Sequence, residues 1–141
     1  MSRPLQSEAG YSLVEVMASI MILTIAIIPM VAMFDVGLES ATLGGNYDRA
    51  RGFATSKLEE IKGLPYDQLK ARHPVSATAS PLPADGSGLP AGSTYTVETD
   101  YLRIEGEEFV TDNSRDTGLM RVTVTVTWPQ GSYTTMGLKT R

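Results

Sequence analysis

The chain has 141 residues, a formal net charge of −4 and no cysteine, so it holds one small domain at most besides any membrane segment. The acidic balance and the lack of a basic run exclude a nucleic-acid-binding surface. Without cysteine, a disulfide, a thiol nucleophile and a cysteine metal site are all excluded, and a single histidine excludes a histidine cage. We therefore expect no enzymatic activity, no cofactor and no metal centre.

An apolar segment follows the first residues of the chain. Residues 16–34 form a run of 19 positions without a charge. A helix rising about 1.5 Å per residue over that length just spans a hydrocarbon core of about 30 Å. A buried core helix would show an apolar stripe, whereas this segment is apolar all round. A cleaved secretory signal peptide is the other alternative, but its apolar stretch is shorter and ends in a small-residue cleavage site. We predict a membrane-spanning helix.

The charges and the proline around this segment add detail. Arg3 precedes the span while Asp35 and Glu39 follow it, a bias that favours a cytoplasmic N-terminus. Pro29 lies inside the span, where its missing N–H group predicts a kink or a local opening of the helix. Glu15 lies near the start, and a carboxylate at membrane depth costs about 2.5–3.5 kcal/mol and favours pairing with an opposite charge.

The stretch GYSLVEV at residues 10–16, followed by an apolar helix with an interior proline, resembles the processing segment of type IV prepilins and type II secretion pseudopilins. In that family a hydrophilic leader ends in glycine, an aromatic residue follows, and a glutamate stands four positions later. Tyr11 takes the place of the usual phenylalanine. The resemblance implies that a prepilin peptidase cleaves between Gly10 and Tyr11 and that Tyr11 is then N-methylated. It also implies that Glu15 pairs, during filament assembly, with the terminal amine of a neighbouring subunit.

The next segment, residues 36–62, has the pattern of an amphipathic helix that continues from the first. Its apolar positions recur at spacings of three and four residues: Tyr47, Ala50, Ala54, Leu58 and Ile61. Gly63 and Pro65 predict its end near Lys62. Gly44 and Gly45 predict a bend or a brief break in its middle.

A loop and a sheet complete the chain. Residues 73–92 are rich in Pro, Gly, Ser and Ala and predict a long surface loop. Three strands follow, STYTVETDYLRI, MRVTVTVTW and SYTTMGLKT, the last two joined as an antiparallel hairpin. The predicted class is α+β, with a long N-terminal helix packed on a small antiparallel sheet of about three strands.

The expected organisation is therefore a leader over residues 1–10, a transmembrane or filament-core helix over 11–35, an amphipathic helix over 36–62, a loop over 63–92 and a sheet over 93–141. The helix end FATSKLEEIKGLPYDQL and the final RVTVTVTWPQGSYTTMGLKTR are similar to PilV-type minor pilins and to pseudopilin I. The C-terminal cysteine pair of many major pilins is absent here.

For three further features we expect ordinary surface groups rather than a metal-binding or catalytic site. The stretch from Asp112 to Asp116 alternates acids as a calcium loop does, but it lacks the glycine and glutamate that such a loop needs. A solvated turn is expected instead. His73 has no catalytic partner pattern and is expected at the surface. The run EGEE at residues 105–108 is expected to be solvated charge.

The resemblance implies a minor pilin or pseudopilin subunit of the bacterial inner membrane, with its C-terminal domain outside the cytoplasm. Its partners would be the prepilin peptidase, other pilin or pseudopilin subunits, the inner-membrane assembly platform and, before assembly, lipid. The alternative is a simply anchored periplasmic binding module that does not enter a filament.

Overall fold

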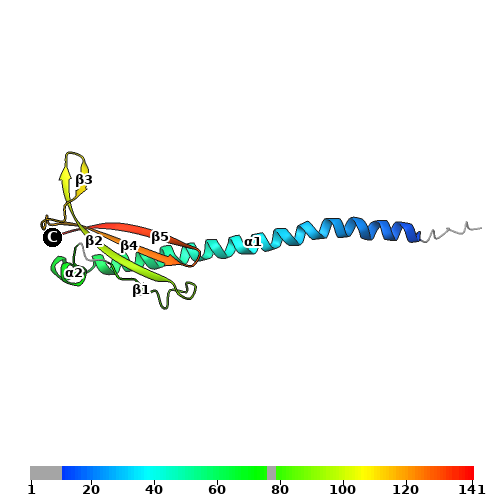
Figure 1. The fold of residues 1–141 in the computed structure, drawn as a ribbon, viewed down its shortest axis with the longest axis horizontal. Coiled ribbons are helices and arrows are strands. Elements are labelled where there is room, and N and C mark those ends of the chain that lie inside the picture. The colour runs from blue at the N-terminus through cyan, green and yellow to red at the C-terminus, as the bar shows by residue number, and fades with distance from the viewer. Residues whose placement is uncertain (1–10, 76–78) are drawn as a thin grey trace, which may run out of the picture. The chain divides into compact units, whose positions relative to one another are not determined.

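The computed structural model describes residues 11–75 and 79–141, so the predicted leader over residues 1–10 lies outside the described part. Its elements in chain order are α1 (Leu13–Lys62), α2 (Tyr66–Arg72), β1 (Leu82–Pro83), β2 (Thr94–Glu105), β3 (Glu108–Thr111), β4 (Leu119–Trp128) and β5 (Gly131–Thr140) (Figure 1). The fold is α+β, with the long helix packed on an antiparallel sheet, as predicted. The sheet has five strands in the described residues rather than about three.

The sheet has the strand order β1-β2-β4-β5, and β3 pairs with β2 outside this path. All of its pairs are antiparallel. The two strands that the sequence did not predict are the shortest. β1 has two residues, one of them Pro83, and lies inside the expected loop. β3 has four residues and follows a tight turn in which Gly106 has φ +64°, a conformation that glycine adopts without a Cβ clash.

The helix α1 belongs to two compact units, with the boundary between Ala41 and Thr42. In the second unit its buried residues are Asn46, Ala50, Ala54, Leu58 and Ile61. Four of them belong to the predicted stripe, and Tyr47 is half-exposed instead. Ala50 and Ala54 are fully buried; their short side chains let the helix backbone approach the sheet closely.

The strand β4 supplies the centre of the core. Its residues Met120, Val122, Val124 and Val126 have no exposed surface, and Trp128 is buried beside them, which confirms the predicted alternation. Two aromatic pairs join α1 to the neighbouring strands. The pairs are Tyr47 with Tyr133 and Phe53 with Tyr95, and in each the ring centroids lie 5.4 Å apart in edge-to-face geometry. Such pairs add to the area-based stabilisation of the core.

The end of α1 is as predicted, but its middle is not. The helix ends at Lys62, where the Gly63 N–H donates to the carbonyl of Glu59 at 2.9 Å. The predicted break at Gly44 and Gly45 is wrong, because α1 is helical through both residues. The flanking helix and its buried face outweigh a glycine penalty of about 1 kcal/mol per residue.

Candidate functional site

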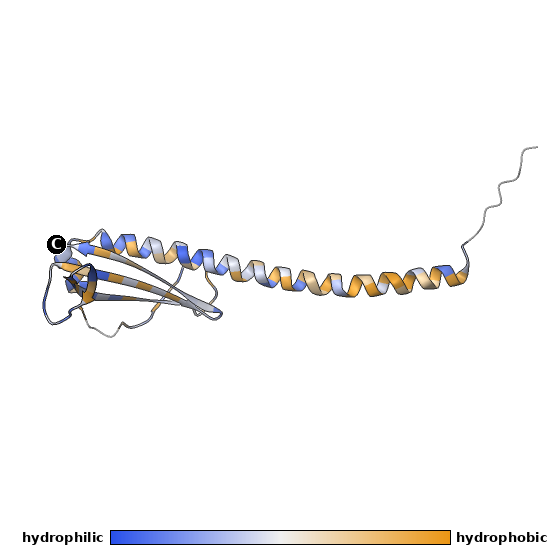
Figure 2. Ribbon diagram, turned by 90° about the horizontal axis from the view of Figure 1, so that it is seen from above, coloured by the Kyte–Doolittle hydropathy of each residue, from blue (hydrophilic) through white to orange (hydrophobic). Residues whose placement is uncertain are grey.

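The first part of α1 carries a continuous apolar surface. From Leu13 to Leu38 its large apolar side chains are exposed, with Ile25 at 73% and Met33 at 74%. Figure 2 shows the corresponding hydrophobic colour along this part of the helix, which gives way to mixed colour further on. The helix is long and apolar enough to cross a membrane. Its fully exposed apolar surface needs a non-aqueous environment, either lipid or neighbouring helices.

The few polar groups inside this surface are largely satisfied within the helix. The Ser19 hydroxyl donates to the backbone carbonyl of Glu15 at 2.8 Å, and the Thr24 hydroxyl donates to that of Ile20 at 2.8 Å. Such back-bonding leaves no free hydroxyl donor, so these residues enter an apolar medium at little cost. Pro29 lies inside α1, which stays helical through it, and its missing N–H leaves the carbonyl of Ile25 without its usual donor.

Glu15 is the acidic residue of the first turn of α1. Within residues 11–75 and 79–141, the structure gives its carboxylate no ion pair and no hydrogen bond. Glu15 and Tyr11 line one shallow groove on the helix surface, together with Val16, Ser19, Ile20 and Leu23. Two of the predicted site residues are therefore neighbours. Gly10 lies outside the described residues.

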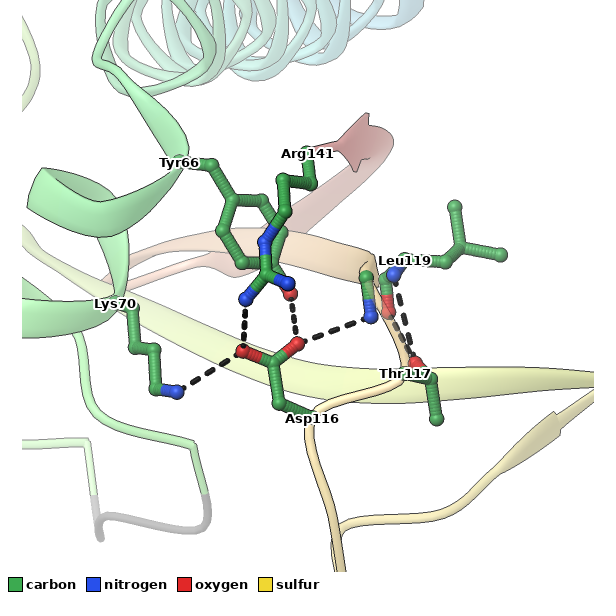
Figure 3. A network of polar contacts seen from close by, with 7 residues as sticks. Tyr66, Lys70, Asp116, Thr117, Leu119 and Arg141 are labelled. Carbon is green, nitrogen blue, oxygen red and sulfur yellow. Dashed lines mark hydrogen bonds and ion pairs between the residues drawn. The ribbon is translucent and has the colours of Figure 1, made fainter.

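The second unit contains a polar cluster that the sequence did not reveal (Figure 3). The carboxylate of Asp116 accepts a hydrogen bond from the Tyr66 hydroxyl at 2.6 Å and from the backbone N–H of Gly118 at 2.9 Å. It also forms ion pairs of 3.0 Å with the Lys70 ammonium and with the Arg141 guanidinium. The cluster thus joins α2, the β3–β4 loop and the C-terminal residue.

The same contacts shift two pKa values in opposite directions. Hydrogen bonds from Tyr66, Gly118 and Lys70 hold the pKa of Asp116 well below its usual range. Burial, together with the neighbouring Asp116 carboxylate, raises the pKa of the Tyr66 phenol well above its usual range. The cluster is therefore an anion held by donors, and this arrangement stabilises the fold.

The predicted solvated turn at residues 112–116 is thus only partly correct. Asp112 accepts hydrogen bonds from the backbone N–H and the hydroxyl of Ser114, as an Asx turn does. Asp116, however, is only 19% exposed at its side chain and has four donors around it. The sequence held no signal for this, because Tyr66 and Lys70 lie 50 and 46 residues away from Asp116.

His73 also differs from the expected surface histidine. It is half-buried at the end of α2, and its carbonyl accepts a hydrogen bond of 2.8 Å from the Thr99 hydroxyl. Burial lowers the pKa of its imidazole.

In the described residues, no group of three or more His, Cys, Asp or Glu side chains lies close enough together to hold a metal ion. Comparisons with protein-family models, with curated proteins and with solved structures found no match for this chain. The first part of α1, with Glu15 in its first turn and Tyr11 just before it, is the candidate functional site. It is a surface for helix packing or lipid, and the polar cluster is a feature of the folded second unit.

Proposed function

We propose that the chain is a minor pilin or pseudopilin subunit, anchored in the bacterial inner membrane and later assembled into, or priming, a type IV pilus or a type II secretion pseudopilus. The observation that carries the proposal is the exposed apolar part of α1 with Glu15 at its start, a carboxylate to which the described residues give no ion pair and no hydrogen bond. A simple anchor needs the apolar surface but not the carboxylate.

Cleavage between Gly10 and Tyr11 would give Glu15 a partner. It creates a free amine on Tyr11, and an amine at the start of an incoming or resident helix is the opposite charge that Glu15 lacks among the described residues. Because the helix leaves lipid only for neighbouring helices of equal apolarity, transfer into a filament keeps its surface covered. In this proposal the N-terminus is cytoplasmic, the sheet-bearing unit is extracytoplasmic, and the partners are the prepilin peptidase, other subunits and the assembly platform.

Intact-mass measurement of the protein, purified from cells with and without a prepilin peptidase, tests the proposal. With the peptidase, we expect the chain to begin at Tyr11 and to carry one added methyl group. Without it, the chain should keep residues 1–10. The variant Gly10→Val should stay uncleaved in both strains, whereas the matched control Ala9→Val should be cleaved like the wild type. A chain never cut after Gly10 would contradict the proposal.

A further inference from the structure

The hairpin of β2 and β3 extends past the main sheet. β2 pairs with β4 from Thr94 to Tyr101, whereas its last residues, from Leu102 to Glu105, pair with β3. Figure 1 shows β3 standing away from the layer formed by β2, β4 and β5. A ladder of four residue pairs is marginal by itself. Leu102 at its base is buried, whereas the residues nearer the turn are free to serve a purpose other than the core.

One face of this hairpin is apolar and exposed. Ile104 and Phe109 lie directly opposite each other in the ladder, with 63% and 56% of their surface exposed. Their face adjoins an open hollow of mixed character. It is lined by the apolar residues Leu102, Ile104 and Leu119 and by the polar residues Arg103, Arg115, Asp116 and Thr117. Two large apolar side chains paired on a projecting hairpin lower the solubility of the free protein.

The end of the other face, next to the turn, and the turn itself are acidic. Glu105 and Glu108 are directly opposite each other, and like charges in that position destabilise a strand pair. Glu107 adds a third carboxylate in the turn. Arg103 forms an ion pair with Glu105, and among the described residues no ion pair offsets Glu107 or Glu108. The hairpin thus combines an exposed apolar pair with uncompensated negative charge, and both are unfavourable for the isolated molecule.

We propose that the β2–β3 hairpin is a docking element for another protein, one that presents a cleft with an apolar wall and a basic wall. The apolar wall would cover Ile104 and Phe109, and lysine or arginine side chains on the basic wall would pair with Glu107 and Glu108. Charge complementarity selects this partner: an anionic membrane surface or a nucleic acid would be repelled by the three carboxylates. The proposal does not depend on assembly into a filament.

Photo-crosslinking in intact cells tests it, with p-benzoylphenylalanine in place of Phe109 in the full chain. We expect one discrete protein adduct, whose crosslinked peptide is apolar and flanked by Lys or Arg. The same probe in place of Met136, an exposed apolar residue of β5 at 65%, should not give this adduct. A product that is absent, that forms equally from position 136, or that lacks basic residues would overturn the proposal. So would an adduct with lipid or with a second copy of this chain.

Charge reversal separates docking from folding. The double variant Glu107→Lys/Glu108→Lys should lose the adduct, whereas Glu98→Lys, an exposed residue of β2 away from the hairpin, should keep it. Because Glu108→Lys removes a like-charge pair, the midpoint of thermal unfolding should stay unchanged or rise. A retained adduct, or a fall in the midpoint of thermal unfolding for Glu108→Lys, would count against a docking role for these carboxylates.

Discussion

At the scale of single residues, Asp116 is the acceptor on which the most distant parts of the second unit converge. Its donors come from α2, from Gly118 in the β3–β4 loop and from the C-terminal Arg141. The Arg141 guanidinium also lies over the ring of Tyr66, 5.3 Å from its centroid. Because several donors share one carboxylate, removing any one of them leaves the others in place, whereas removing the acceptor affects all of them.

The Tyr66 hydroxyl provides a graded test of this cluster. Tyr66→Phe removes one hydrogen bond to a charged acceptor and leaves the buried ring, so the free energy of unfolding should fall by about 1–2 kcal/mol. Chemical denaturation of the full chain in detergent measures it. Tyr133→Phe is the matched control, because the described residues give its hydroxyl no hydrogen bond; its effect should stay within about 0.5 kcal/mol. Equal effects of the two variants would refute the assigned role of the Tyr66 hydroxyl.

The pKa shifts predict how stability depends on pH. The pKa of Asp116 is lower in the folded chain than in the unfolded one. The ionised carboxylate therefore contributes fully to the free energy of unfolding above the unfolded pKa of about 3.9, and this contribution is lost as the pH falls below that value. The pKa of Tyr66 is raised in the folded chain. The neutral phenol therefore contributes fully to the free energy of unfolding below about pH 10, and this contribution is lost at higher pH. Stability should therefore fall at both ends of this range.

Unfolding measured from pH 2.5 to pH 11 on the wild type and on Asp116→Asn checks this dependence. The variant should be less stable near pH 7, and the difference should shrink as the pH falls below about 4, because the wild-type carboxylate then becomes protonated. A stability difference that stays constant from pH 7 down to pH 2.5 would show that the charge of Asp116 is not the stabilising feature.

The proximity of Tyr11 and Glu15 can be predicted from the sequence, whereas the Asp116 cluster cannot. Tyr11 and Glu15 stand four positions apart in one segment, so their proximity follows from chain geometry alone, and the structure places both along one groove. The Asp116 cluster depends on the docking of α2 against the β3–β4 loop. No local pattern encodes that docking, since α2 lies inside residues 63–92, which the sequence predicts to be a loop.

At the scale of elements, the sequence predicted the helix and the strands that have a repeating apolar pattern, and it missed the two shortest strands. β4 alternates over ten residues and α1 keeps its stripe over four turns, so packing and pattern agree. β1 and β3 are too short for a period to show, and their pairing is set by β2, which reaches beyond β4. The predicted break at Gly44 and Gly45 failed for another reason: local propensity is weak beside the packing of a long helix.

The glycines of α1 therefore lower its stability without interrupting it. Gly44 is exposed within the helix, and a Cβ atom there would meet nothing within 4 Å. Gly44→Ala should raise the free energy of unfolding by about 0.5–1 kcal/mol. Gly137→Ala should give no such gain, because its Cβ would lie 3.0 Å from Cδ of Lys62. Denaturant titration of both variants decides the matter, and a destabilised Gly44→Ala would mean that the helix needs flexibility at that point.

At the scale of the whole molecule, the chain contains two units that meet different surroundings. The second unit buries its own core and needs no other chain for it. The first part of α1 exposes nearly all of its apolar surface, so it is stable only in lipid or among other helices. Both a permanent anchor and a filament subunit satisfy this requirement, so the test between them rests on the carboxylate of Glu15.

Glu15→Gln is the variant that separates the two functions. It keeps the size of the side chain and removes the charge, so membrane insertion should be retained or improved, and cleavage after Gly10 should continue. If the carboxylate pairs with the Tyr11 amine of another subunit at membrane depth, a loss of about 2.5–3.5 kcal/mol lowers incorporation into filaments on the order of a hundredfold. Ser19→Ala is the control, since this hydroxyl bonds within its own helix. Quantifying the chain in sheared filaments and in membranes measures both effects. Normal incorporation of Glu15→Gln would show that filament entry does not need this charge and that the acid serves the positive end of the helix dipole instead. Absence of the wild-type chain from sheared filaments would identify α1 as a simple anchor.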